Sequence, residues 1–171
     1  MTTADQISEL IHASFPVDPL PGQFFWADGI EPLGDMPEEI RNRIAGRSWA
    51  EITLPDWAMM GTAPVVARGY FDPNAFRYYL PSLLVGVLRD IAYVDWALEA
   101  ILPANRKRRP KGKWWQEFSE GISVKQRAAI CAFLEGLRGL FWDRIGPAAQ
   151  QSVVEAEAIW FGLENHNDSS S

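Results

Sequence analysis

The sequence predicts an all-α fold, a single compact domain of five or six helices around a kinked central helix, with long irregular loops. Three observations support this prediction. The longest apolar run follows a complete helix start at Asp72 and Pro73. Other apolar residues recur at helical spacing behind capping residues. A chain of 171 residues with 47% hydrophobic residues can bury one sizeable core.

The central helix has a well-defined start. Asp72 can accept hydrogen bonds from first-turn amides, and Pro73 occupies the first helical position, where a missing N–H costs nothing. Phe71 and Phe76 are spaced to form a hydrophobic staple. Pro81 falls inside the helix, where it costs about 3 kcal/mol. We therefore expect a bend at residues 77–81.

The residues behind this start are apolar on two sides, which places the helix in the middle of the domain. One stripe is about 100° wide, and it comprises Phe76, Leu80, Leu83, Leu84, Val87, Ile91, Val94, Leu98, Ile101 and Leu102. Tyr78, Val85 and Trp96 lie opposite. A single helix over 74–101 would be about 42 Å long, and the whole domain about 40 Å across. We therefore expect a break within 89–95, with Asp90 or Asp95 capping a second segment.

The N-terminal part is predicted to alternate short helices with irregular chain. Thr3–Gln6 forms a capping box, and Pro16 ends the first helix. Residues 16–35 hold four prolines, and we expect their aromatic residues to plug the core. A short helix is predicted over 37–47. Residues 65–67 are interpreted as extended chain.

The C-terminal part contains a basic loop over 103–113, followed by Trp114 and Trp115, and two further helices. Ser123–Gln126 is a second capping box. Two glycines in the helix behind it, Gly136 and Gly139, each weaken it by about 1 kcal/mol unless a neighbour packs tightly there. Gly146-Pro147 begins the last helix. The predicted domain covers 1–164, and 165–171 is predicted to be a disordered tail.

The charge is distributed unevenly. The formal net charge is −6, yet six Lys and Arg residues lie within 106–113 with no acid among them. Residues 1–64 hold ten acidic residues against three arginines, a net charge of −7. The protein is therefore predicted to have an acidic body with one basic loop.

Composition also indicates the compartment. The only cysteine, Cys131, cannot form an internal disulfide. Residues 1–11 lack the basic and apolar regions of a signal peptide. The longest uncharged apolar stretch, 78–88, is too short to span a bilayer. We expect a soluble cytoplasmic protein without membrane attachment.

Two segments carry a resemblance to a family. Residues 75–81 (Ala-Phe-Arg-Tyr-Tyr-Leu-Pro) precede residues 122–134, which open with Ile-Ser-Val-Lys-Gln and end in Phe-Leu. Together they resemble an uncharacterised bacterial domain family in which a Phe-Arg-Tyr-Tyr-Leu-Pro motif is paired with a later Ser-Pro-Glu-Gln helix start. Residues 46–49 are similar to its Gly-Lys-x-Trp element. The resemblance covers about residues 40–135, and it implies a shared fold unit but no activity, because that family carries none.

No catalytic, cofactor or metal site is predicted. His12 lies off the apolar stripe of the first helix and His166 lies in the tail, so they cannot complete a three-ligand zinc site. Cys131 is interpreted as a small hydrophobic residue. No phosphate-binding glycine loop, nucleophile elbow or dinucleotide fingerprint is present. Acidic residues 35, 38 and 39 are expected at a helix N-terminus for dipole reasons alone.

Arg77, Tyr78 and Tyr79 form one candidate binding site. In the structural interpretation, their polar groups satisfy carbonyls freed by Pro81. In the functional interpretation, they line a polar pocket at the bend.

The basic loop forms a second candidate, with Arg106, Arg108, Arg109 and Trp114 as binding residues. Cations followed by tryptophans can bind phosphates and stack bases. A solvated or protein-contacting loop is the alternative, because an acidic body repels a long nucleic acid.

These observations lead to three hypotheses. The first is a non-catalytic, acidic protein-interaction protein, such as an immunity-type inhibitor that neutralises a basic toxin. The second is a nucleic-acid accessory protein that uses residues 106–113. The third is a small enzyme with a site at residues 77–81. We favour the first, in which the partner is a protein.

Overall fold

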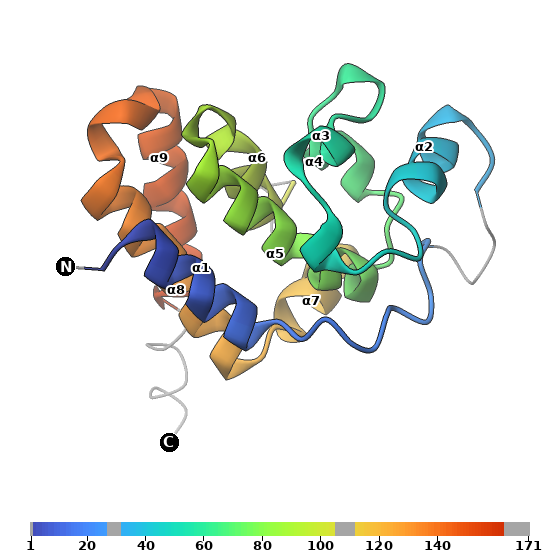
Figure 1. Ribbon diagram of the computed structural model, residues 1–171, viewed down its shortest axis with the longest axis horizontal. Coiled ribbons are helices and arrows are strands. Elements are labelled where there is room, and N and C mark those ends of the chain that lie inside the picture. The colour runs from blue at the N-terminus through green and yellow to red at the C-terminus, as the bar shows by residue number, and fades with distance from the viewer. Residues whose placement is uncertain (1, 27–31, 105–111, 163–171) are drawn as a thin grey trace.

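The computed structural model of the protein describes residues 2–26, 32–104 and 112–162 and confirms the all-α prediction (Figure 1). The α-helices of the described residues are α1 (Ala4–Ser14), α2 (Asp35–Arg43), α3 (Leu54–Trp57), α4 (Pro64–Arg68), α5 (Pro73–Arg89), α6 (Val94–Ala100), α7 (Lys113–Glu120), α8 (Val124–Leu140) and α9 (Trp142–Trp160). Three 3₁₀ helices join them: η1 (Trp49–Glu51), η2 (Met59–Gly61) and η3 (Ile91–Tyr93). The predicted tail, 165–171, lies outside the described residues.

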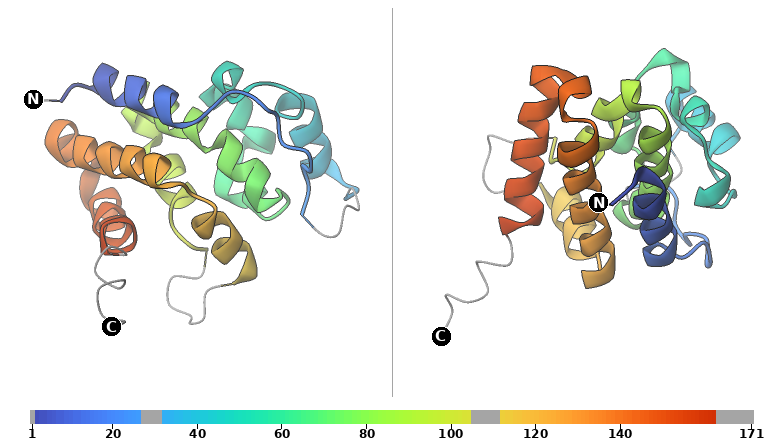
Figure 2. Two further views of the ribbon diagram at one scale, coloured as in Figure 1. Left: turned by 90° about the horizontal axis from the view of Figure 1, so that it is seen from below. Right: turned by 60° about the vertical axis from the view of Figure 1, so that its left-hand side comes forward.

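Helix α5 is the centre of the fold. Its start is as predicted: Asp72 accepts from the amide of Asn74 at 2.9 Å, and the rings of Phe71 and Phe76 lie 5.6 Å apart. Helices α1, α3, α6 and α7 all pack against it (Figures 1 and 2). Twelve of its 17 residues are buried, so the prediction of a helix apolar on two sides is confirmed.

The predicted kink in this helix is wrong. Helix α5 continues through Pro81, which is buried inside it. The hydroxyl of Ser82 donates to the carbonyl of Tyr79 at 2.6 Å, which gives one carbonyl near the proline a partner. The helices packed around α5 leave little room for a bend. The burial of apolar side chains between α5 and these helices offsets the free-energy cost of a proline inside a helix.

The chain changes direction at two other places. The predicted break within 89–95 is confirmed: α5 ends at Arg89, Asp90 caps η3 by accepting from the amide of Ala92, and α6 follows. The second change lies in α9, where Gly146 has a φ of 79°, which favours glycine. Pro147 then begins the longer part of α9, as predicted.

The prediction of five or six helices is too low; the described residues form nine α-helices. Helices α3 and α4 have four and five residues, too few to show an apolar period. Residues 65–67 were expected to be extended but belong to α4, which begins at Pro64. Trp114 and Trp115 lie in the first turn of α7.

Aromatic side chains fasten the irregular segments to the core, as predicted. Phe25 is buried and forms an isolated antiparallel bridge with Phe71. The indole N–H groups of Trp49 and Trp160 donate to the carbonyls of Phe15 and Ile101 at 3.1 and 2.9 Å. Each buried indole therefore fixes a position where one segment meets another.

The crossing of α1 and α8 depends on Gly136. A Cβ atom there would lie 2.3 Å from Cδ1 of Ile7, a fully buried side chain of α1. A Cβ atom at Gly139, one turn later in α8, would meet nothing within 4 Å. The two glycines of α8 therefore differ: one allows close packing, and the other only weakens the helix.

We predict that Gly136→Ala lowers the free energy of unfolding by about 1 kcal/mol or more, because Ile7 must move in a closed core. Gly139→Ala should raise it by up to about 1 kcal/mol, through helix propensity alone. Urea unfolding of both variants measures the two effects. Equal stabilisation by both would contradict the close approach of Ile7.

Candidate functional site

The side chain of Arg77 links α5 to the end of α7. Its Nη1 donates to the carbonyls of Glu117 and Phe118 at 3.3 and 3.4 Å, and its Nη2 donates to Asn74. Gly121, which follows α7, leaves space for the guanidinium: a Cβ atom there would overlap Nη1. Partial burial lowers the pKa of Arg77, against the opposing effect of Asp72.

The two tyrosines of the motif link α5 to the N-terminal part. The hydroxyl of Tyr78 donates to the carbonyl of Val17 at 2.6 Å. The hydroxyl of Tyr79 lies 2.7 Å from the carbonyl of Arg47 and 3.2 Å from that of Ile44. Tyr79 is fully buried, and this burial raises its pKa well above the ordinary value.

The structural interpretation of the motif therefore needs one correction. The carbonyls that accept from Arg77, Tyr78 and Tyr79 belong to other segments of the chain and were not freed by Pro81. A cavity of about 150 Å³ remains beside Arg77 and Tyr78, and Asp18 and Gln126 also line it. Tyr79 does not line this cavity, so Arg77, Tyr78 and Tyr79 do not form a common pocket.

The second candidate lies mostly outside the described residues, because Arg106, Arg108 and Arg109 belong to 105–111. Trp114 is described and is half-buried. Its ring stacks on Phe118 with centroids 5.4 Å apart, and its indole N–H donates to the carbonyl of Phe71 at 2.8 Å. The guanidinium of Arg68 lies 5.4 Å from the ring centroid. Trp114 thus contributes to the packing of α7 against its neighbours.

A larger cavity lies nearer the N-terminus. It has a volume of about 270 Å³, and we call it the Trp49 cavity after the buried tryptophan of η1 that lines it. Residues 49–55 form one side and the second half of α5 the other. His12 of α1 also lines it, with its ring centroid 4.8 Å from that of Trp49.

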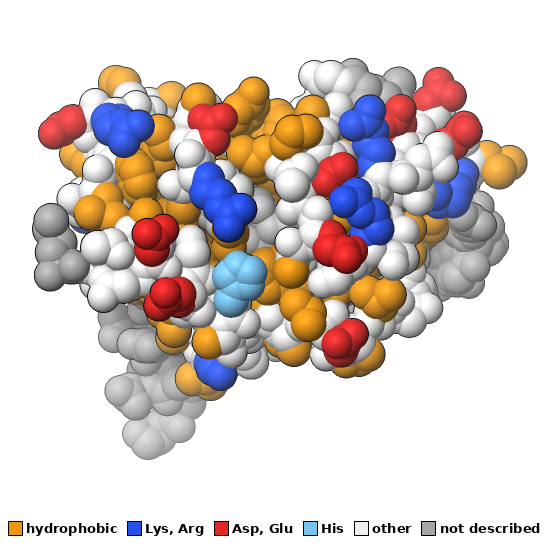
Figure 3. Space-filling view, in the orientation of Figure 1, with side chains coloured by type: hydrophobic (Ala, Val, Ile, Leu, Met, Phe, Trp, Pro, Cys, Tyr) orange, Lys and Arg blue, Asp and Glu red, His pale blue; other side chains and the backbone are white. Residues whose placement is uncertain are grey.

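The Trp49 cavity has an apolar lining with polar groups among it. The apolar lining residues include Trp49, Ile52, Leu54 and Val85, and the polar ones are His12, Thr53, Ser82, Arg89 and Asp90. Figure 3 shows the face of the molecule that α1 crosses, where hydrophobic side chains reach the surface between groups of both charges. The lining and the small volume suit one bulky side chain or a small molecule.

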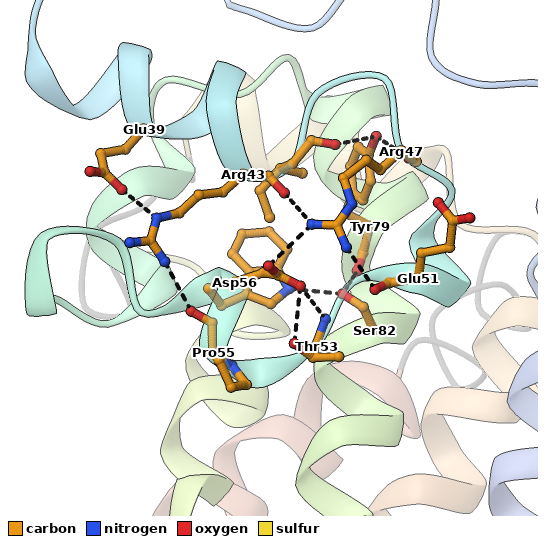
Figure 4. Close-up of polar contacts among 11 residues, drawn as sticks. Glu39, Arg43, Arg47, Glu51, Thr53, Pro55, Asp56, Tyr79 and Ser82 are labelled. Carbon is orange, nitrogen blue, oxygen red and sulfur yellow. Dashed lines mark hydrogen bonds and ion pairs between the residues drawn. The ribbon is translucent and has the colours of Figure 1, made fainter.

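A polar network holds one wall of this cavity in place (Figure 4). Arg47 forms an ion pair with Asp56 at 3.1 Å and donates to the carbonyl of Glu51 at 3.1 Å. Asp56 in turn accepts from the amide and hydroxyl of Thr53, at 2.9 and 3.0 Å. Arg43 donates to the carbonyl of Pro55 at 3.3 Å. The loop between η1 and α3 is therefore fixed by charged groups behind it.

The same network shifts the pKa of Asp56. Burial would by itself raise this pKa, but the hydrogen bonds from Thr53 and Arg47 and the charge of Arg47 outweigh burial. The net effect lowers the pKa of Asp56 below its ordinary value. Asp56 therefore stays ionised in the folded state to lower pH than in the unfolded chain.

Comparison with known proteins places the chain in a family. A family of unknown function (DUF6714) matches residues 3–154, which include both segments of the sequence motif. The chain belongs to this family. No curated protein and no solved structure matches the DUF6714 chain. The family therefore supplies no ligand or reaction for the Trp49 cavity.

The described part of this DUF6714 protein contains neither a cluster of metal-binding side chains nor a helix that could span a membrane. Within residues 2–26, 32–104 and 112–162, no three His, Cys, Asp or Glu side chains gather closely enough to hold a metal ion. No helix in these ranges has the length and apolar character needed to cross a membrane.

Sequence reasoning missed the Trp49 cavity of this DUF6714 chain and the network behind it. One local signal was present: Thr53 and Asp56 have the spacing of a capping box and form one in the structure. The sequence around Arg47 and Asp56 does not predict their ion pair, because the pair forms only when the chain turns back after η1.

The interpretation of Cys131 as a buried small hydrophobic residue needs qualification, since the residue is half-buried.

We predict that Asp56→Asn lowers the free energy of unfolding by about 1 kcal/mol at pH 7, through loss of the ion pair and part of the cap. Because the pKa of Asp56 is lowered by folding, its contribution exists above the pKa of the unfolded chain, near 4. It disappears as the pH falls through the folded-state pKa.

Urea unfolding at pH 7 and at pH 3 tests this prediction. The difference between wild type and Asp56→Asn should shrink at pH 3. Glu51→Gln, in an exposed residue whose carboxylate forms no ion pair among the described residues, is the control and should change stability little at either pH. A difference that stays the same at pH 3 would contradict the role of the carboxylate charge.

Proposed function

We propose that the protein is a non-catalytic binding protein whose acidic N-terminal surface captures a basic protein partner. An immunity-type inhibitor that masks a cationic bacterial toxin is the sharpest form of this proposal. The observation that supports it most directly is the position of the three arginines within residues 1–64.

All three arginines interact within the protein. Arg43 pairs with Glu39 at 2.5 Å, and Arg47 pairs with Asp56 at 3.1 Å. Arg41 donates to the carbonyl of Pro32 at 3.2 Å. Their positive charges therefore neutralise neighbouring carboxylates or lie against backbone oxygens.

The other carboxylates in the described part of this region lie at the surface. There are six of these, all exposed and without an ion pair within the described residues: Asp5, Glu9, Asp18, Asp35, Glu38 and Glu51. They extend over α1, the segment behind it, α2 and η1. Such an excess of one charge steers an oppositely charged partner and speeds its association. The proposal therefore requires a cationic partner and an affinity that falls with salt.

We predict that reversing three of these charges, in Asp5→Lys/Glu9→Lys/Glu51→Lys, weakens binding of the basic partner at least tenfold at low salt. The matched control reverses three exposed acidic residues of other helices, in Glu120→Lys/Glu135→Lys/Asp143→Lys. Both variants change the net charge equally, so only the position of the charge differs.

Purification from the native cell, followed by titration of the isolated pair at two salt concentrations, measures these effects. A basic partner should co-purify in stoichiometric amount with wild type and with the control variant, and high salt should release it. The proposal fails if the protein elutes alone, or if both variants lose the partner equally.

A further inference from the structure

We propose that the Trp49 cavity is an anchor pocket that receives one bulky apolar side chain, of the phenylalanine type, from a basic segment of the partner. This inference rests on the proposed function and specifies the chemistry of the partner. It combines the lining of the cavity, the charges around it and the rigidity of its wall.

The lining selects an apolar anchor. Trp49, Leu54 and Val85 present aromatic and aliphatic surface to the cavity. A volume of about 270 Å³ is near the lower limit for pockets that hold drug-sized ligands, and it fits a single aromatic side chain. Protein interfaces commonly contain such a central apolar pocket inside a charged rim.

The negative charges around the cavity favour an anchor residue that is flanked by Lys or Arg in the sequence of the partner. Asp90 lines it, Glu51 follows the lining residue Ala50, and Glu9 lies one helical turn before His12. All three carboxylates are exposed. Arg89 is the one Lys or Arg among the described lining residues, and its guanidinium can lie over an aromatic ring. An aromatic residue flanked by lysines therefore complements both the lining and the rim.

Close packing and an ion pair hold the wall of the cavity in place. Leu54 approaches α5 at Gly86, where a Cβ atom would lie 2.8 Å from it. The ion pair of Arg47 and Asp56 holds α3, the short helix that begins at Leu54. A pocket whose wall is already ordered loses less conformational entropy on binding. More of the free energy gained by burying the anchor side chain is then left as binding free energy.

Two synthetic peptides test the inference: Lys-Lys-Phe-Lys-Lys and Lys-Lys-Ala-Lys-Lys, each titrated onto the full chain at low salt and followed by NMR. Burial of the phenyl ring should make the Phe peptide bind at least tenfold more tightly than the Ala peptide. Both affinities should fall as salt is added.

A variant that fills the cavity locates the site. Ala50 is exposed and lines the cavity, so Ala50→Trp should abolish the preference for Phe and retain the salt-dependent attraction. Ala128→Trp, at an exposed position on α8, is the control and should keep the preference. Amide spectra of both variants verify that they fold.

The outcomes separate the two proposals. Equal, salt-dependent binding of both peptides to wild type would overturn the anchor pocket and leave the acidic binding surface standing. A preference for Phe that persists in Ala50→Trp would also overturn the anchor pocket. If neither peptide binds wild type at low salt, the acidic surface fails and the anchor pocket fails with it.

Discussion

The burial of α5 is the constraint on which the rest of the structure depends. A helix with 12 of 17 residues buried needs neighbours around it, and α1, α3, α6 and α7 provide them. Three polar residues of α5, Arg77, Tyr78 and Tyr79, take part in the same packing. Arg77 binds the end of α7, and the two tyrosines after it bind the segments that follow α1 and α2. The sequence motif is therefore explained first by architecture.

The same constraint places the candidate binding surface. The hydroxyl of Tyr79 holds the chain at Arg47, from which the guanidinium reaches back to Asp56. That pair fixes the loop that forms one wall of the Trp49 cavity, and α5 forms the other wall. Arg47 pairs with Asp56 and donates to backbone carbonyls, so it forms no ion pair with the exposed carboxylate of Glu51. The ion pair of Arg47 and Asp56, rather than Tyr79 itself, thus holds the wall of the pocket.

Local sequence signals predicted the parts of this structure that depend on local chemistry. The caps at Thr3, Asp72 and Ser123 need only residues within one turn, and all three are confirmed. The continuity of α5 through Pro81 depends on neighbours distant in sequence, and periodicity cannot weigh their packing. Helices as short as α3 bury few residues and carry no period. The Trp49 cavity was missed for the same reason, since it combines α1, η1, α3 and α5.

The central claim is that the motif of α5 is architectural, while binding takes place at the acidic surface. The most direct test compares Tyr79→Phe with wild type in urea unfolding and in binding of the Lys-Lys-Phe-Lys-Lys peptide. Loss of the hydroxyl removes the hydrogen bond to the carbonyl of Arg47 and the longer contact with the carbonyl of Ile44, so the free energy of unfolding should fall by about 1–2 kcal/mol. The peptide affinity of the folded variant should be unchanged. Unchanged stability together with lost binding would contradict the account.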